Sequence, residues 1–155
     1  MDNPKSTVKI PQLQITIAGG SDYPLLIDIW EASVRNTHSF LKSDDIDFYK
    51  NFIAGGLLET LAVYCIKIQG LICGFIGMTK NSLEMLFVAP EHFNKGLGTL
   101  LLLFAIGKGI DRVEVNEQNQ AALRFYQRSG FRIVDRKSLD NFGKPYPILT
   151  LGYVG

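Results

Sequence analysis

LEMLFVAPEHFNKGLGTLLLL, residues 83–103, is the most informative segment of this sequence. It begins with an apolar run that ends at Pro90, continues with a glycine-bearing loop, and closes with a run of leucines. This order predicts a strand, a tight loop and a helix. The first turn of such a helix presents unpaired backbone N–H groups and the positive end of the helix dipole. An anionic group, such as a phosphate, is therefore expected where this strand ends.

The length and composition predict one globular domain over residues 1–155. Of the 155 residues, 46% are hydrophobic and 20% are charged, and a chain of this size can bury a substantial core. The 16 basic and 15 acidic residues give a formal net charge of +1. This balance provides no basic surface of the kind that nucleic acid or an anionic membrane requires, so neither partner is expected.

The sequence predicts a cytoplasmic protein without a metal site. Residues 1–14 lack the apolar segment of a signal peptide. Residues 100–106 form the longest apolar run, which is far shorter than the ~20 residues of a membrane span. Cys65 and Cys73 lie in adjacent apolar segments and lack zinc-ligand spacing, so we expect buried free thiols. The run 100–106 is apolar nearly all round, and the protein is expected to be a monomer or a homodimer.

Strands and helices alternate along the rest of the chain. Strands are predicted from apolar alternation or short apolar runs at residues 13–17, 61–68, 71–78, 83–88, 113–115, 131–134 and 148–153. Helices are predicted from apolar residues that recur three or four positions apart. The first carries Pro24 in its first turn and runs to about residue 37, and the second runs from Ser43 to the glycines at 55–56. Two more are predicted at residues 97–106 and 117–128.

This order of elements predicts an α/β (α+β) fold with a mixed, mostly antiparallel sheet. Six or seven strands would be flanked by about four helices. The strands at 83–88 and 113–115 are joined by a crossover helix, so we expect them to be parallel neighbours. Two such strands that splay apart would leave a cleft for an extended ligand.

The pentapeptide Lys95-Gly96-Leu97-Gly98-Thr99 is the first candidate site. Gly96 and Gly98 can expose successive amides to a pyrophosphate, and Lys95 adds a positive charge. The alternative is a strand-to-helix turn that merely needs glycine, and the pentapeptide alone does not decide between the two. It is neither a P-loop nor a dinucleotide fingerprint, because the GKS/T sequence and the third glycine are missing.

A second candidate site consists of Asn119, Ala122 and Tyr126, which lie at helical spacing on one face. The small Ala122 would let a thin ligand pass between the amide and the phenol. Taken alone, the three residues favour another interpretation, in which Asn119 is a helix cap and the other two are core residues.

Together the two stretches resemble the GNAT superfamily of N-acetyltransferases. VAPEHFNKGLGTLLL and NQAALRFYQRSGF carry the resemblance over about residues 83–131. The sequences WEASVRNTHSFL (30–41) and GKPYP (143–147) look closer still to the small bacterial YjaB-type members. The resemblance implies the GNAT fold over virtually the whole chain and acetyl transfer from acetyl-CoA to an amine acceptor.

The resemblance also implies how the coenzyme is bound. The strand backbone at 86–88 would pair with the pantetheine arm, the loop amides would hold the pyrophosphate, and Asn119 would hydrogen-bond the pantetheine. The implied cofactor-binding residues are Leu86, Phe87, Val88, Asn94, Lys95, Gly96, Leu97, Gly98, Thr99, Asn119, Ala122 and Tyr126. Family members usually carry Arg or Gln where this chain has Phe93, so Lys95 compensates for that loss or the affinity is weaker.

The resemblance implies that Tyr126 protonates the departing thiolate, because a phenol with a pKa of about 10 keeps its proton at neutral pH. Glu84 would be the general base, unless it merely points to solvent from the strand end. His38 would serve as a base, as an acceptor-binding group or in a structural role. Tyr146 and Trp30 are assigned with His38 and Glu84 to the acceptor side.

We therefore expect an N-acetyltransferase in which the acceptor attacks acetyl-CoA directly in a ternary complex, without an acyl-enzyme. The alternative is a coenzyme A-binding module without catalysis, and a purely structural domain is a third interpretation. Protein N-termini, lysine side chains, polyamines and small amines all remain open as acceptors.

Overall fold

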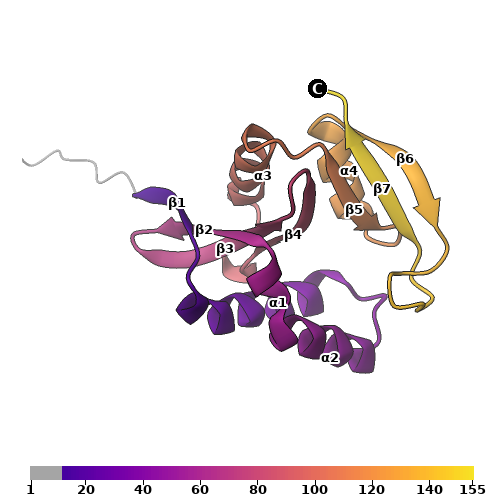
Figure 1. Cartoon of the computed structure of the whole chain (residues 1–155), viewed down its shortest axis with the longest axis horizontal. Helices are drawn as coiled ribbons and strands as arrows, with labels where there is room; N and C mark the ends of the chain where they lie inside the picture. The colour runs from indigo at the N-terminus through magenta and orange to yellow at the C-terminus, as the bar shows by residue number, and fades with distance from the viewer. Residues whose placement is uncertain (1–11) are drawn as a thin grey trace, which may run out of the picture.

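The structure is a computed structural model that describes residues 12–155. Residues 1–11, which belong to the segment where we predict no export signal, lie outside this range. The elements, in chain order, are β1 (Leu13–Ile17), α1 (Tyr23–Thr37), α2 (Ser43–Phe52), β2 (Ala62–Ile68), β3 (Leu71–Met78), β4 (Ser82–Val88), α3 (Leu97–Gly107), β5 (Arg112–Asn116), α4 (Gln120–Arg128), β6 (Phe131–Lys137) and β7 (Ile148–Tyr153) (Figure 1). No helix in the described part of the chain is both long and apolar enough to span a membrane.

The strands form one seven-stranded sheet in the order β1-β2-β3-β4-β5-β7-β6. Every neighbouring pair is antiparallel except β4 and β5, which are parallel and are connected through α3. Helices α1 and α2 cover one face of the sheet and α3 and α4 the other (Figure 1). This arrangement confirms the predicted fold class, including the single parallel pair.

Three predicted boundaries differ from the structure by more than one residue, and local pairing explains two of them. Helix α4 begins at Gln120 rather than at residue 117, because the Asn119 side chain accepts a hydrogen bond from the Ala122 N–H at 3.1 Å and caps the helix there. Strand β6 continues beyond residue 134 to Lys137, because it pairs with β7 as far as Ile148. Helix α2 ends at Phe52, before the glycines predicted to close it, and the chain continues as a π-helical turn over Ile53–Leu57 in which Gly56 has a φ of 123°.

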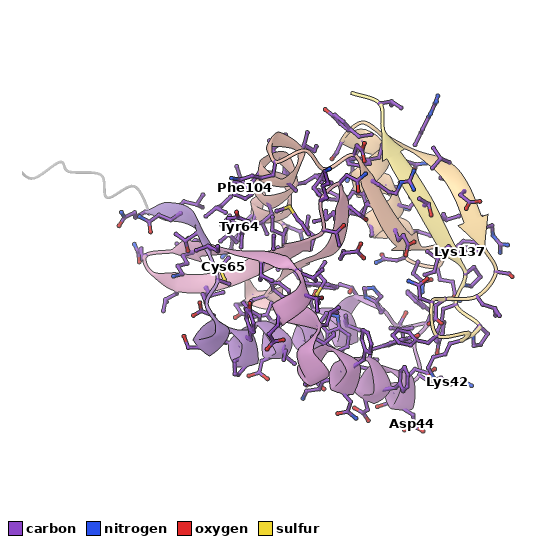
Figure 2. The ribbon with its side chains drawn as sticks, in the orientation of Figure 1. Lys42, Asp44, Tyr64, Cys65, Phe104 and Lys137 are labelled. Carbon is purple, nitrogen blue, oxygen red and sulfur yellow. The ribbon has the colours of Figure 1, made fainter. Side chains whose placement is uncertain are left out.

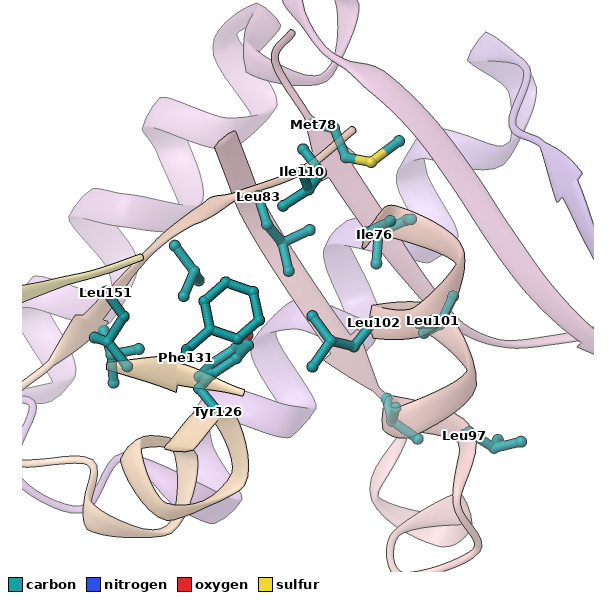
Figure 3. Close-up of a cluster of buried hydrophobic side chains, with 14 of the residues drawn as sticks. Ile76, Met78, Leu83, Leu97, Leu101, Leu102, Ile110, Tyr126, Phe131 and Leu151 are labelled. Atoms are coloured by element: carbon teal, nitrogen blue, oxygen red, sulfur yellow. The ribbon is translucent and has the colours of Figure 1, made fainter. Parts of the chain in front are cut away.

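The sheet separates two apolar cores. One lies beneath α3 and α4, where Leu101 and Leu102 of α3 pack near Phe131 and Tyr126 (Figure 3). The other lies beneath α1 and α2. Side chains of β2 point alternately into the two cores. Tyr64 contacts Phe104 of α3 at a ring distance of 4.8 Å, whereas the next residue, Cys65, belongs to the core beneath α1 and α2 (Figure 2).

Helix α3, which is apolar nearly all round as predicted, is buried on one side and partly exposed on the other. Its inner residues are fully buried against the sheet, whereas Leu100 and Leu103 are 39% and 60% exposed. The helix is therefore covered on one side by its own sheet and open on the other.

A β-bulge at Glu84 changes which face of the sheet the following side chains of β4 point to. Met78 of β3 pairs with Leu83 and Gly77 pairs with Met85, so Glu84 is an extra residue on β4. Residues two apart in a regular strand share a face. Here Leu83 enters the core beneath α3 and α4, and Met85 enters the core beneath α1 and α2. The bulge therefore reverses the alternation of β4 where it passes between the two cores.

Candidate active site

A groove opens where strands β4 and β5 part. The two strands pair only through Ser82 with Arg112 and Leu83 with Val113. Beyond these pairs a cavity of about 390 Å³ lies between β4, β5, α1 and α4, and we call it the strand half of the groove. A second cavity of about 400 Å³, the loop half, lies between the end of β4, the following loop and the first turn of α3. The two halves adjoin, because they share the lining residues Ser33, Thr37, Leu86 and Phe87.

The loop half is built from the end of β4 and the residues around the first turn of α3. Asn94 and Gly96 both have left-handed backbone conformations, with φ of 61° and 81°, and these turn the chain sharply into the helix. The helical hydrogen bonds begin with Leu100 N–H to the Gly96 carbonyl at 3.2 Å. The N–H groups between these two residues belong to the first turn and have no intrahelical acceptor. These donors and the helix dipole suit an anionic group such as a pyrophosphate.

The side chains of this loop contribute unequally. Phe93 lines the loop half and packs on the core beneath α3. Lys95 is exposed and is absent from the lining of both halves. His92 lines the loop half, and its Nδ1 is buried without a hydrogen-bond partner among residues 12–155. The loop half therefore offers backbone N–H donors and the His92 ring, and no Lys or Arg among the described residues lines it.

Tyr126 lies at the strand half. The side chain projects from α4, is 7% exposed, and packs edge-on against Phe131 at a ring distance of 5.8 Å (Figure 3). Burial raises the pKa of its phenol above the ordinary value. Tyr126 therefore remains protonated at neutral pH and can act as a proton donor.

Two carboxylates lie along the strand half. Glu84 occupies the bulge of β4 and is exposed. Glu114 of β5 is held by the Lys137 ammonium at 3.3 Å and the Asn141 amide at 3.4 Å. Glu84 has no hydrogen bond or ion pair within the described residues, so it is the unpaired carboxylate of the two.

His38 and Asn119 meet across the strand half. His38 follows the last residue of α1, and Asn119 is the N-cap residue of α4. The Nε2 atom of His38 lies 3.3 Å from Asn119 Nδ2. The other ring nitrogen lies 2.7 Å from the Thr37 hydroxyl. Burial lowers the pKa of the His38 imidazole to about 4, so the ring is neutral at physiological pH.

Two residues predicted for the acceptor side lie behind the groove walls. Trp30 is buried in the core beneath α1, with its ring edge-on to Phe87 at 6.5 Å. Tyr146 is buried, donates its hydroxyl proton to the Asp45 carboxylate and accepts a hydrogen bond from the Lys42 N–H at 3.2 Å. Neither side chain lines the loop half or the strand half.

Ser33 and Thr37 line both halves of the groove, and the sequence analysis did not single them out. They lie four residues apart on α1 and so share one face. Ser33 is 5% exposed, whereas its buried neighbours on α1 are apolar. A hydroxyl at a buried position of an apolar helix face was the signal that could have identified Ser33.

Comparisons with known proteins identify the family. Residues 59–133 match the family model described as an acetyltransferase (GNAT) domain. Over 131 residues the chain is 32% identical to peptidyl-lysine N-acetyltransferase YjaB of Escherichia coli (strain K12), which covers 84% of this chain and 89% of that protein. The chain belongs to the GNAT acetyltransferase family. The predicted resemblance to this superfamily and its YjaB-type members is thereby confirmed, as is the expected class of enzyme.

Solved structures agree with this GNAT assignment. The solution structure of apo YjaB from Escherichia coli matches with a TM-score of 0.85 and 29% identity, over 93% of this chain and 99% of that chain. The PaiA N-acetyltransferase from Thermoplasma acidophilum, solved in complex with coenzyme A, matches with a TM-score of 0.68 and 21% identity, over 92% of this chain and 99% of that chain. The second likeness shows that the fold is shared. Among residues 12–155 no group of three or more His, Cys, Asp or Glu side chains could hold a metal ion.

The environment of His38 predicts a pH dependence of stability. Its pKa is about 4 in the folded protein and about 6.5 in an unfolded chain. Between these values the unfolded state binds more protons, so the stability contributed by neutral His38 is lost as the pH falls from about 6.5 towards 4. Between about pH 7 and pH 4.5, we expect the Tm of the wild type to fall more than that of His38→Gln, which cannot titrate. Calorimetric melts would measure this, and equal losses would contradict it.

Proposed function

We propose that the protein transfers the acetyl group of acetyl-CoA to the primary amine of a lysine side chain in another protein. The observation that carries this proposal is the groove that runs from the first turn of α3 to Tyr126. The named activity of the relative YjaB, a peptidyl-lysine N-acetyltransferase, supports lysine as the acceptor.

The loop half suits the diphosphate of the coenzyme. The free N–H groups of Leu97, Gly98 and Thr99 would bind the phosphate oxygens without the basic side chain that Phe93 replaces. A Cβ added to Gly98 would lie 3.7 Å from the Phe125 ring, an ordinary contact distance. Gly98 therefore faces the Phe125 ring at the first turn, where the N–H donors are the groups available to the phosphate oxygens.

The free edge of β4 suits the pantetheine arm. Beyond Leu83, strand β4 remains paired with β3 on one side but no longer with β5 on the other. The backbone groups of residues 86–88 on that open edge can bind an extended amide chain as an added strand. Asn119 and the half-buried Ala122 line the opposite side of the strand half. The narrow Ala122 leaves room for the thin pantetheine between them.

The chemistry that acetyl-CoA supplies is an acetyl thioester, whose carbonyl carbon a neutral amine can attack. Glu84 would accept one proton from the lysine ammonium through water, which leaves the neutral amine. As the carbon–nitrogen bond forms and the carbon–sulfur bond breaks, Tyr126 donates its proton to the departing sulfur. The second proton released by the nitrogen then restores the phenol, and the exposed Glu84 releases the first proton to solvent.

Direct transfer to the amine is favoured over an acyl-enzyme, because no reactive thiol lines the groove within the described residues. Cys65 and Cys73 are 0% and 1% exposed and belong to the two cores. Burial raises the pKa of the Cys65 thiol to about 11. A thiol with so high a pKa holds little thiolate at neutral pH and is a poor nucleophile.

Replacing Tyr126 with Phe removes the proposed general acid and little else. We expect Tyr126→Phe to lower kcat about 100-fold, in the range for loss of a general acid. The KM for acetyl-CoA should change less than about threefold, because the ring and its packing remain. Thiol release with a lysine peptide would measure both. Tyr153→Phe, outside the groove, is the matched control, and an unchanged kcat in Tyr126→Phe would remove Tyr126 from this role.

Glu84→Gln tests the proposed base. At about pH 7 we expect kcat/KM for the lysine peptide to fall roughly 100-fold. The deficit should shrink as the pH rises, because more of the acceptor is then already neutral. Glu59→Gln, on an exposed turn outside the groove, is the control. A pH-independent loss that lies only in the KM for the peptide would assign Glu84 to acceptor binding instead of proton transfer.

A further inference from the structure

A directed chain of hydrogen bonds crosses the strand half between α4 and α1. The Ala122 N–H donates to Asn119 Oδ1 at 3.1 Å, so the nitrogen of this amide is the atom that faces His38. Asn119 Nδ2 therefore donates to His38 Nε2 at 3.3 Å. The Thr37 hydroxyl donates to the Ser33 carbonyl at 2.8 Å, so the same oxygen accepts from His38 Nδ1–H at 2.7 Å.

This chain specifies the protonation of the His38 ring. Nδ1 carries the proton and Nε2 is the acceptor, because each partner can play only one role. Both nitrogens are thus engaged within the protein. A ring held in this way has no free lone pair for the proton of an acceptor amine, which argues against His38 as the general base.

Asn119 retains one unused donor. Its oxygen caps α4 and one N–H binds His38, whereas the second N–H of the amide has no partner among residues 12–155. Asn119 and His38 both line the strand half. The His38 contact fixes the rotation of the amide, because the helix cap alone leaves the rest of the side chain free to turn.

We propose that His38 is a positioning residue that orients the Asn119 amide so that its second N–H can bind a carbonyl oxygen of the pantetheine arm. This inference rests on the proposed function of the groove. Thr37 supports the ring from α1, and the chain ties the ends of two helices that lie on opposite faces of the sheet (Figure 1). His38 therefore acts on the coenzyme through Asn119 rather than on the acceptor.

The test is a double-mutant cycle read out by calorimetric titration with coenzyme A. His38→Leu removes the acceptor for Asn119, and Asn119→Ser removes the amide while keeping an oxygen that can cap α4. We expect each single variant to weaken coenzyme A binding about five- to tenfold, as for the loss of one oriented hydrogen bond. The double variant should bind within about twofold of Asn119→Ser, because His38 acts only through that amide.

A conservative variant and a spectroscopic measurement complete the test. His38→Gln offers an amide oxygen near the position of Nε2 and should restore wild-type affinity to within about threefold. In ¹⁵N spectra of the wild type, His38 should show a protonated Nδ1 and an unprotonated Nε2 at about pH 7. The opposite tautomer would overturn the proposal.

The binding data also separate this inference from the proposed function. A wild type that fails to bind coenzyme A would refute the proposed function itself. Normal binding by the wild type and by His38→Leu would refute only the role of His38. Independent, multiplicative losses in the double variant would likewise refute it, because His38 would then act without Asn119.

Discussion

The site depends on the early separation of two parallel strands. Strands β4 and β5 share only the pairs at Ser82 and Leu83, and the bulge at Glu84 follows directly. An unpaired strand edge is costly to bury unless another group satisfies its N–H and C=O groups. On β4 that edge lines a groove, so a ligand with amides of its own can complete the sheet. The separation thus creates both the space and the open backbone groups that the proposed coenzyme site requires.

The bulge links this geometry to the two cores. It lets Leu83 anchor β4 beneath α3 and α4 while Met85 anchors it beneath α1 and α2. The residue between them is left exposed at the edge of the groove. The local irregularity that supports packing on both faces therefore also presents a carboxylate in the strand half, which Tyr126 lines as well. One bulge therefore lets β4 pack against both cores and leaves the Glu84 carboxylate in the strand half.

The sequence predicted those features of the groove that depend only on residues a few positions apart in the chain. The glycine-bearing loop before α3 and the Asn119 cap are determined by neighbouring residues, so both could be inferred. The bulge could not, because Leu83 and Met85 follow the period of a regular strand. The contact of His38 with Asn119 joins residues 81 positions apart, and no periodic pattern encodes it. Trp30 was predicted on the acceptor side but is buried in the core. Its helical spacing predicts burial, and this spacing is the same for a core position and for a groove wall.

We propose that the groove between β4 and β5 holds acetyl-CoA with its sulfur beside Tyr126. A crystal structure of the protein with coenzyme A tests this most directly. We expect the pantetheine to lie along residues 86–88 of β4, with the pyrophosphate at the first turn of α3 and the sulfur within hydrogen-bond distance of the Tyr126 hydroxyl. A coenzyme bound elsewhere, or one whose sulfur points away from Tyr126, would contradict it.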